Sequence, residues 1–72
     1  MPMFTPNGDA IRLRRKQRGR RMKCFAHDIG VSERTLRDIE RLNKPIDDAL
    51  AARIASVLKI GREDVVFAPD RS

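Results

Sequence analysis

The apolar residues of this chain recur at helical spacing, and no stretch of four or more residues alternates between apolar and polar as a half-buried strand would. The clearest stripe consists of Leu50, Ile54, Val57 and Leu58, at positions i, i+4, i+7 and i+8. Capping and helix-breaking residues divide the chain into five such segments. The pattern therefore predicts an all-α, compact domain of four to five helices.

The expected boundaries come from N-capping side chains, which accept hydrogen bonds from first-turn amides, and from glycine and proline, which end helices. The helices should run from Thr5-Pro6 or Asn7 to about Arg18, from about Arg21 to Ile29, from the Ser32 cap to the break at Asn43-Lys44-Pro45, from the Asp47 cap to Gly61, and from Glu63 to Phe67. The domain should then span residues 7–68, between an N-terminal tail at 1–6 and a frayed tail at 69–72.

The second and third segments have a more specific spacing than the others. Two helices joined by about three residues must cross steeply, so the crossing needs a small residue and the turn needs one that accepts positive φ. Ala26 and Gly30 meet these needs, and Val31 fills the space beneath the turn. The apolar residues that complete the pattern are Phe25, Ile29, Leu36 and Ile39. This spacing predicts a helix-turn-helix.

The charge of the chain is concentrated in one stretch. The formal net charge is +6, and eight basic residues and no acidic residue lie between Arg12 and Lys23. The rest of the chain carries 8 basic and 10 acidic side chains, so it is nearly neutral. A cationic run is most often a solvated face, but this density beside a helix-turn-helix favours a phosphate-binding surface.

Length and composition exclude several classes of protein. A chain of 72 residues forms one domain at most, which leaves no large cleft between domains. Its 40% apolar content is too high for a typical disordered tail, and no apolar run approaches the roughly 18 residues that span a bilayer. No signal peptide is visible at the N-terminus. We expect a cytoplasmic protein with no membrane association.

The residues that could carry chemistry are few. With Cys24 as the only cysteine and His27 as the only histidine, neither an internal disulfide nor a structural zinc set can form. Cys24 is interpreted as a buried or half-buried small hydrophobe rather than a redox sensor, and His27 as an exposed or half-exposed helix residue. The sequence contains no phosphate-cradling glycine loop, nucleophile elbow or metal cluster. We expect a non-enzyme with no cofactor, metal or small-molecule ligand.

The string FAHDIGVSERTLRDIE, within residues 22 to 41, resembles the helix-turn-helix of the Cro/phage-repressor (XRE) family. The resemblance extends from about Asp9 to Phe67. It implies a five-helix, lambda-repressor-like fold with the helix-turn-helix at about residues 21–42. In that fold the second helix crosses the DNA backbone and the third lies in the major groove of double-stranded DNA. The function implied is that of a small bacterial or phage-type transcriptional regulator.

The resemblance also implies roles for individual residues. DNA bases would be read from the exposed positions of the third helix, Glu33, Arg34, Thr35, Arg37 and Asp38. Arg34 and Arg37 are the strongest of these, because an arginine fork can donate to O6 and N7 of guanine. Phosphates would be contacted by Arg20, Arg21, Met22, Lys23, Ser32, Arg41 and Lys44. Arg15 would form a structural ion pair with Glu40 at the end of the third helix.

The sequence departs from the family pattern at four positions. The leucine usual before the family arginine is Arg14 here, and the apolar residue is Leu13, which leaves open whether Arg14 or Arg15 pairs with Glu40. The glutamine that opens the second helix is Met22, and the serine or threonine cap before it is Arg21. The glycine two residues after the glutamate is Leu42, so the exit from the third helix has no explanation in the sequence.

Two further expectations concern partners. The last helix of this family is often a subunit contact, so the candidates for a homodimer interface are Val65, Val66 and Phe67. At the other end of the chain, Met3 and Phe4 are interpreted as a lid on the core rather than an arm or a dimer contact. The alternative function is a protein-interaction module on the same scaffold, such as an antitoxin, phage inhibitor or adaptor. Glu33 and Asp38 favour it, because they bring negative charge to a surface that should face phosphates.

Overall fold

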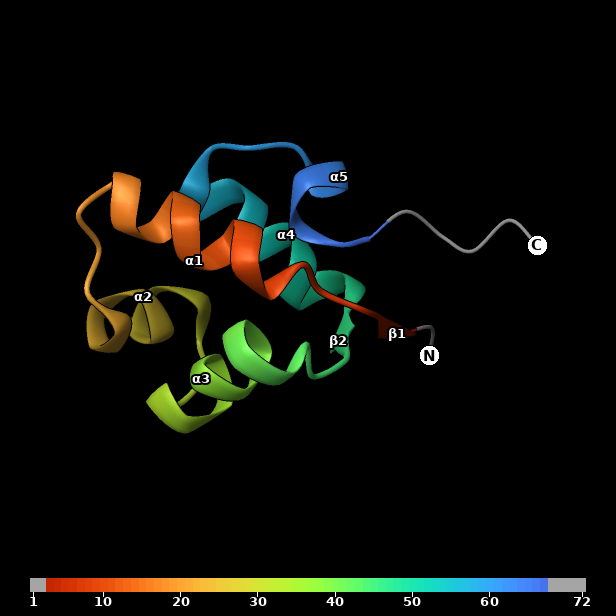
Figure 1. Ribbon diagram of the computed structural model, residues 1–72, viewed down its shortest axis with the longest axis horizontal. Helices are drawn as coiled ribbons and strands as arrows, with labels where there is room; N and C mark the ends of the chain where they lie inside the picture. Colours follow the sequence, from red (N-terminus) through yellow and green to blue (C-terminus); the bar gives the residue numbers. More distant parts are fainter. Residues whose placement is uncertain (1–2, 68–72) are drawn as a thin grey trace.

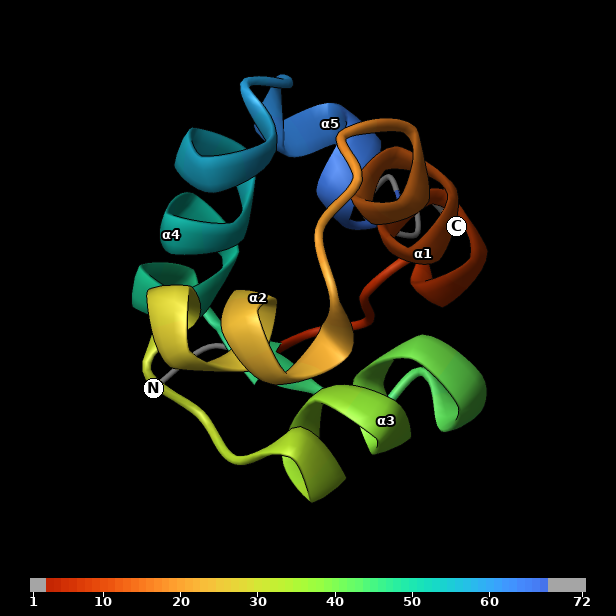
Figure 2. The ribbon, with the colours of Figure 1, turned by 90° about the vertical axis from the view of Figure 1, so that its left-hand side faces the viewer.

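The computed structural model describes residues 3–67, which form five helices and one small antiparallel sheet around a single core. Figure 1 shows α2 and α3 on one side of α1 and the sheet at one end, and Figure 2 shows α1 and α4 on opposite sides of the domain. The elements are β1 (Met3–Phe4), α1 (Gly8–Gln17), α2 (Met22–Ile29), α3 (Glu33–Leu42), β2 (Ile46–Asp47), α4 (Asp48–Leu58) and α5 (Arg62–Val65). The expected tail at 69–72 lies outside the described residues.

Three of the helices begin at the side-chain caps that the sequence predicts. The side chains of Asn7, Ser32 and Asp47 accept hydrogen bonds from first-turn amides at 3.2, 3.1 and 2.8 Å. Each bond satisfies an amide that the helix itself leaves without an acceptor. The end of α4 was expected at Gly61 but lies earlier, because Lys59 takes a left-handed conformation with φ of 55°.

The all-α prediction is right for most of the chain but misses the sheet. β1 pairs with β2 in the register Met3 with Asp47 and Phe4 with Ile46. Strands of two residues are too short to show a period in the sequence, and only their partner in space defines them. From Met3 onward, the expected N-terminal tail is therefore part of the packed domain.

Residues 3–7 also pair with the other end of the described chain. The amide of Asn7 donates to the carbonyl of Val65 at 2.7 Å, and the amide of Phe67 donates to the carbonyl of Thr5 at 3.0 Å. Phe4 is half-buried and Met3 is exposed, so of the two residues interpreted as a lid only Phe4 covers part of the domain. The N-terminal segment thus ties β2 to the end of α5.

The core contains most of the apolar residues that helical spacing placed inside, together with Ile46 and Val65, which the spacing did not place there. The fully buried large side chains include Ile11, Phe25, Ile29, Leu36, Ile39, Ile46, Ile54, Leu58 and Val65. Leu13 is the exception, with 57% of its surface exposed. Ile11 and Arg15, one helical turn apart, form the inner face of α1 and leave Leu13 on the outer face. None of the helices within residues 3–67 is long and apolar enough to cross a membrane.

Candidate nucleic-acid interface

The turn between α2 and α3 has the geometry that the sequence predicts. Gly30 ends α2 with φ of 77°, in the left-handed region that favours glycine. The amides of Gly30 and Val31 donate to the carbonyls of His27 and Ala26 at 3.1 and 2.9 Å. Ala26 is buried, and Ser32 then starts α3. The two helices are therefore joined by three residues and packed directly on each other.

The outer face of α3 is mainly basic. Leu36, Ile39 and Glu40 are the buried residues of this helix. At 3.6 residues per turn, the opposite side carries Arg34, Arg37, Asp38 and Arg41. All three arginines are exposed, and Asp38 is half-buried. Arg41, which the sequence assigned to a phosphate contact, shares this face with three of the residues assigned to bases, Arg34, Arg37 and Asp38.

The first turn of α3 carries polar residues that already bond to each other. The Ser32 hydroxyl accepts from the amide of Thr35 at 3.1 Å and donates to the Thr35 hydroxyl at 2.9 Å. The proton that Ser32 would offer to a phosphate is thus directed to Thr35, whose own hydroxyl proton stays available. Glu33 is exposed beside this pair, in the first turn, where the helix dipole favours an acid.

Arg15 holds α3 against α1 through a buried ion pair with Glu40. The Arg15 Nε and Nη2 atoms donate to the two Glu40 carboxylate oxygens at 2.8 and 3.1 Å, and the side chains are only 8% and 1% exposed. Arg15 Nη1 also donates to the carbonyl of Arg20 at 2.9 Å, so the same guanidinium fixes the connection from α1 to α2. Arg14 is exposed and lies on another side of α1.

Asn43 supplies the exit from α3 that the sequence left unexplained. The helix continues through Leu42, which is 74% exposed, and turns at Asn43 with φ of 52°. Asparagine tolerates this left-handed conformation better than most residues. Its side-chain oxygen accepts from the amide of Gly8 at 3.0 Å, which joins the end of α3 to the start of α1. A side chain on Gly8 would collide with the carbonyl oxygen of Glu40.

The start of α2 carries the other cations expected at phosphates. Arg21 occupies the cap position without a side-chain cap bond, so the first amides of α2 have no side-chain acceptor there. Arg21 and Lys23 are exposed, whereas Met22 is half-buried and packs against the core. Arg20 forms an exposed ion pair with Asp28 at 2.7 Å. Lys44, beyond α3, is exposed.

Two residues are buried differently from the expectation. Val65 is fully buried in the core, so it cannot line a dimer interface; Val66 is half-buried, and Phe67 remains 49% exposed. Cys24 is exposed rather than buried, because it lies on the outer side of α2 next to the inward Phe25. His27 is exposed. Within residues 3–67, no group of His, Cys, Asp and Glu residues could hold a metal ion.

Comparison with known proteins supports this geometry. The family model described as Helix-turn-helix matches residues 11–65, from the inner face of α1 to the end of α5. No curated protein sequence gives a significant match. Among solved structures, the chain is similar to the clp gene regulator ClgR from Corynebacterium glutamicum, with 28% sequence identity and a TM-score of 0.73.

The similarity to ClgR covers 79% of this chain and 61% of the ClgR chain, so the protein spans less than two thirds of that relative's length. The family consists of DNA-binding regulators and not of enzymes. The matched region contains the α2–α3 unit, the Arg15–Glu40 pair and the complete helical core. The chain therefore belongs to the helix-turn-helix family, of the Cro/phage-repressor type.

Proposed function

We propose that this protein binds double-stranded DNA sequence-specifically, with α3 in the major groove, and acts as a small bacterial or phage-type transcriptional regulator. The observation that carries the proposal is the row of exposed arginines on the outer face of α3, Arg34, Arg37 and Arg41. The major groove of B-DNA, about 12 Å wide, admits an α-helix. Within it, Arg34 and Arg37 donate to guanine, while Glu33, Thr35 and Asp38 provide the remaining base contacts.

Backbone contacts come from the elements beside α3. The uncapped first turn of α2 offers amides to a phosphate, and Arg21 and Lys23 add charge at the same place. Lys44 lies beyond the opposite end of α3. Arg20 reaches DNA only by giving up its exposed bond to Asp28, which is worth little in water. Met22 contributes through its backbone amide, because its side chain packs against the core.

The recognition helix is held rigidly, which lowers the entropy that binding must overcome. Its start is capped by Ser32, its end is joined to α1 through Asn43, and its buried Glu40 is held by Arg15. These three connections lie at three different positions along α3. They fix both the direction of the helix and its rotation about its own axis, which decides which side chains meet the bases.

The proposed regulator acts as a homodimer. A dimer would bind two half-sites about 34 Å apart on one face of the duplex. Val66 and Phe67 remain the proposed contact after the burial of Val65 is taken into account, and Phe67 offers the larger exposed apolar surface. Similarity to ClgR, which is described as a gene regulator, supports the regulatory part of the proposal.

The experiment is selection of bound duplexes from a random library. We expect an enriched sequence with two symmetric half-sites. The double variant Arg34→Ala/Arg37→Ala should lose this enrichment, because each lost guanine contact costs about 1–3 kcal/mol of binding free energy. The matched control is Arg14→Ala/Lys59→Ala, which removes the same charge far from α3. A library that gives no enriched sequence with the native protein would refute the proposal.

The alternative class, a protein-interaction module, rests on the exposed Glu33 and on Asp38 among the arginines of α3. Such a module would bind an acidic or mixed protein surface with the same face. In that case the native protein shows no saturable binding to duplex DNA at low salt. The Arg34→Ala/Arg37→Ala variant then loses a protein partner instead of a DNA sequence.

A further inference from the structure

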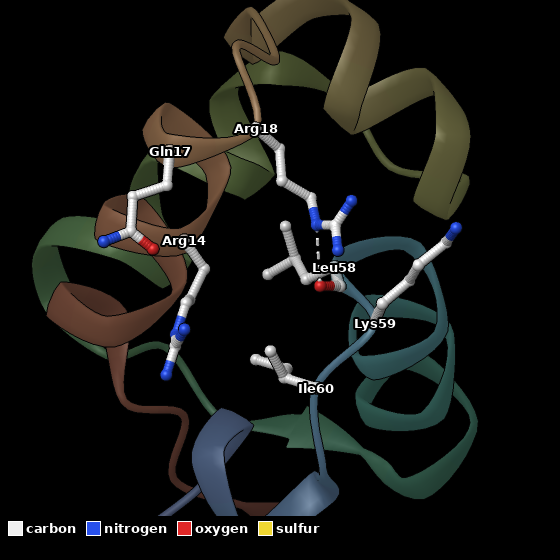
Figure 3. Close-up of a pocket in the computed structure, with 6 residues that line it drawn as sticks. All are labelled: Arg14, Gln17, Arg18, Leu58, Lys59 and Ile60. Atoms are coloured by element: carbon white, nitrogen blue, oxygen red, sulfur yellow. Dashed lines mark hydrogen bonds between the residues drawn. The ribbon is translucent and has the colours of Figure 1, made fainter.

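A hollow of about 390 Å³ lies between the C-terminal half of α1 and the connection from α4 to α5. Its lining consists of Arg14, Gln17, Arg18, Leu58, Lys59 and Ile60. Figure 3 shows Arg14 and Gln17 on one side of the space, Lys59 and Ile60 on the other, and Arg18 reaching toward the carbonyl of Leu58. The volume is within the range of about 300–1,000 Å³ that small-molecule sites occupy.

Three cations line this hollow and no acid does. Arg14 and Arg18 are one turn apart on α1, where like charges repel each other, and Lys59 adds a third positive charge from α4. The ion pairs found within residues 3–67 involve Arg15, Arg20 and Arg62, and none of the three lining cations. This concentration of positive charge without an internal counter-charge suits an anion.

Of the three cations, Arg18 is held in place by a contact within the domain. Arg18 Nε donates to the carbonyl of Leu58 at 2.9 Å, which fixes the plane of the guanidinium and leaves its terminal nitrogens for another acceptor. Lys59 has φ of 55°, a left-handed conformation that lysine rarely adopts and that places it at the rim. The half-buried Ile60 supplies an apolar wall.

This hollow is separate from the DNA-facing surface. Figure 2 shows α3 at the bottom of the domain and the connection between α4 and α5 at the top. A duplex lying along α3 therefore approaches the opposite end of the molecule. The cations of the hollow are not required for the proposed base or phosphate contacts. Ligand binding at this site can therefore be tested independently of the proposed function.

We propose that the hollow binds a small molecule that carries a phosphate monoester, held by Arg14, Arg18 and Lys59. A phosphate monoester has a charge of about −1.5 to −2 near pH 7, which three cations neutralise. Two arginine forks match the geometry of its oxygens, and lysine adds a point charge. The remainder of the ligand lies against Ile60, while Gln17 offers a neutral donor and acceptor.

The test is a titration of ¹⁵N-labelled protein with glycerol phosphate, with inorganic phosphate and acetate as parallel probes and chloride at matched ionic strength as reference. We expect saturable amide shifts confined to residues around Arg18 and Ile60. The affinity for glycerol phosphate should fall about tenfold in Arg14→Ala/Lys59→Ala, because two charged contacts are lost. It should stay unchanged in Arg34→Ala/Arg37→Ala, which loses the same charge elsewhere. Well-dispersed spectra establish that both variants fold.

Three results would overturn the proposal. The shifts could be spread over all basic residues without saturation, or equal for both double variants, either of which indicates general charge attraction. Acetate could bind as tightly as the phosphates, which excludes the phosphate class. Finally, Arg14→Ala/Lys59→Ala could weaken DNA binding as much as Arg34→Ala/Arg37→Ala does, which would make the hollow part of the DNA surface. That last result leaves the proposed function standing.

Discussion

Two groups of exposed cations lie at opposite ends of this domain, and they differ in what surrounds them. The arginines of α3 project from a convex helix face that also carries Glu33 and Asp38. The cations of the hollow line a concave space without an acid. A convex row can enter a groove of a larger partner, whereas a concave cluster encloses a smaller one. The same residue types thus indicate different partners because of the shape that presents them.

Arg15 lies between these two groups and belongs to neither. Its neighbour in sequence, Arg14, lines the hollow, whereas Arg15 is buried against Glu40. The cationic run between Arg12 and Lys23 is therefore not one surface. It supplies a structural pair, part of a hollow, an exposed pair with Asp28 and the cations at the start of α2.

The largest effect is expected from a substitution that breaks the ion pair between Arg15 and Glu40. Glu40→Ala leaves the Arg15 guanidinium buried without its partner, which should lower the free energy of unfolding by about 3–5 kcal/mol. Arg14→Ala, one residue from Arg15 and exposed, should change it by less than about 0.5 kcal/mol. Urea denaturation of both variants provides the measurement. Equal effects would show that the pair does not hold α3.

A smaller effect is expected at Asn43, which joins α3 to α1. Asn43→Ala loses the bond to the Gly8 amide and places alanine at positive φ, so the free energy of unfolding should fall by about 1–2 kcal/mol. Asn43→Gly loses the same bond without the strain and should cost about half as much. Thermal unfolding of the two variants separates the contributions. A larger loss for glycine than for alanine would contradict the role of the backbone conformation.

Lys59 offers a test that sharpens the contrast between stability and binding. Lys59→Gly relieves the positive φ and should stabilise the fold by about 0.5 kcal/mol after the chain-entropy cost of glycine. Lys59→Ala keeps the strain and should leave stability nearly unchanged. Both should weaken binding of glycerol phosphate, as measured by the same amide shifts. Full retention of phosphate binding in both variants would remove Lys59 from the proposed site.

The smallest expected effect concerns the proposed phosphate contacts beside α3. Arg21→Ala and Lys23→Ala should each reduce the slope of log K against log salt by about 1, with the enriched sequence unchanged. Fluorescence anisotropy at several salt concentrations measures the slope. Arg14→Ala serves as the control and should leave the slope as it is. A reduced slope in the control would extend the DNA surface to the hollow.

The sequence predicts the helices and the core well because both depend on local information. Ser32, Gly30 and Ala26 have roles that follow from the chemistry of a cap, a positive φ and a tight crossing. The position of Leu13 shows where this fails, since an isolated apolar residue does not reveal the rotation of its helix. Ile11 and Arg15 together define that rotation, but only once Glu40 is known to face them.

The parts that the sequence misses depend on contacts between distant residues. The β1–β2 pairing joins residues more than 40 positions apart, and the hollow brings Arg18 to the carbonyl of Leu58. The role of Asn43 at the exit from α3 was missed, although asparagine tolerates positive φ, and its bond to Gly8 requires the tertiary structure. No local pattern indicates that Arg14 and Lys59 share a space.

The measurement that tests the central claim most directly is the map of amide shifts on addition of the duplex enriched by selection. We expect shifts along the outer face of α3, at Arg34, Arg37 and Arg41, and at the start of α2, with the residues around Ile60 unaffected. Shifts centred on the hollow, with α3 unchanged, would contradict the assignment of α3 as the DNA-reading helix.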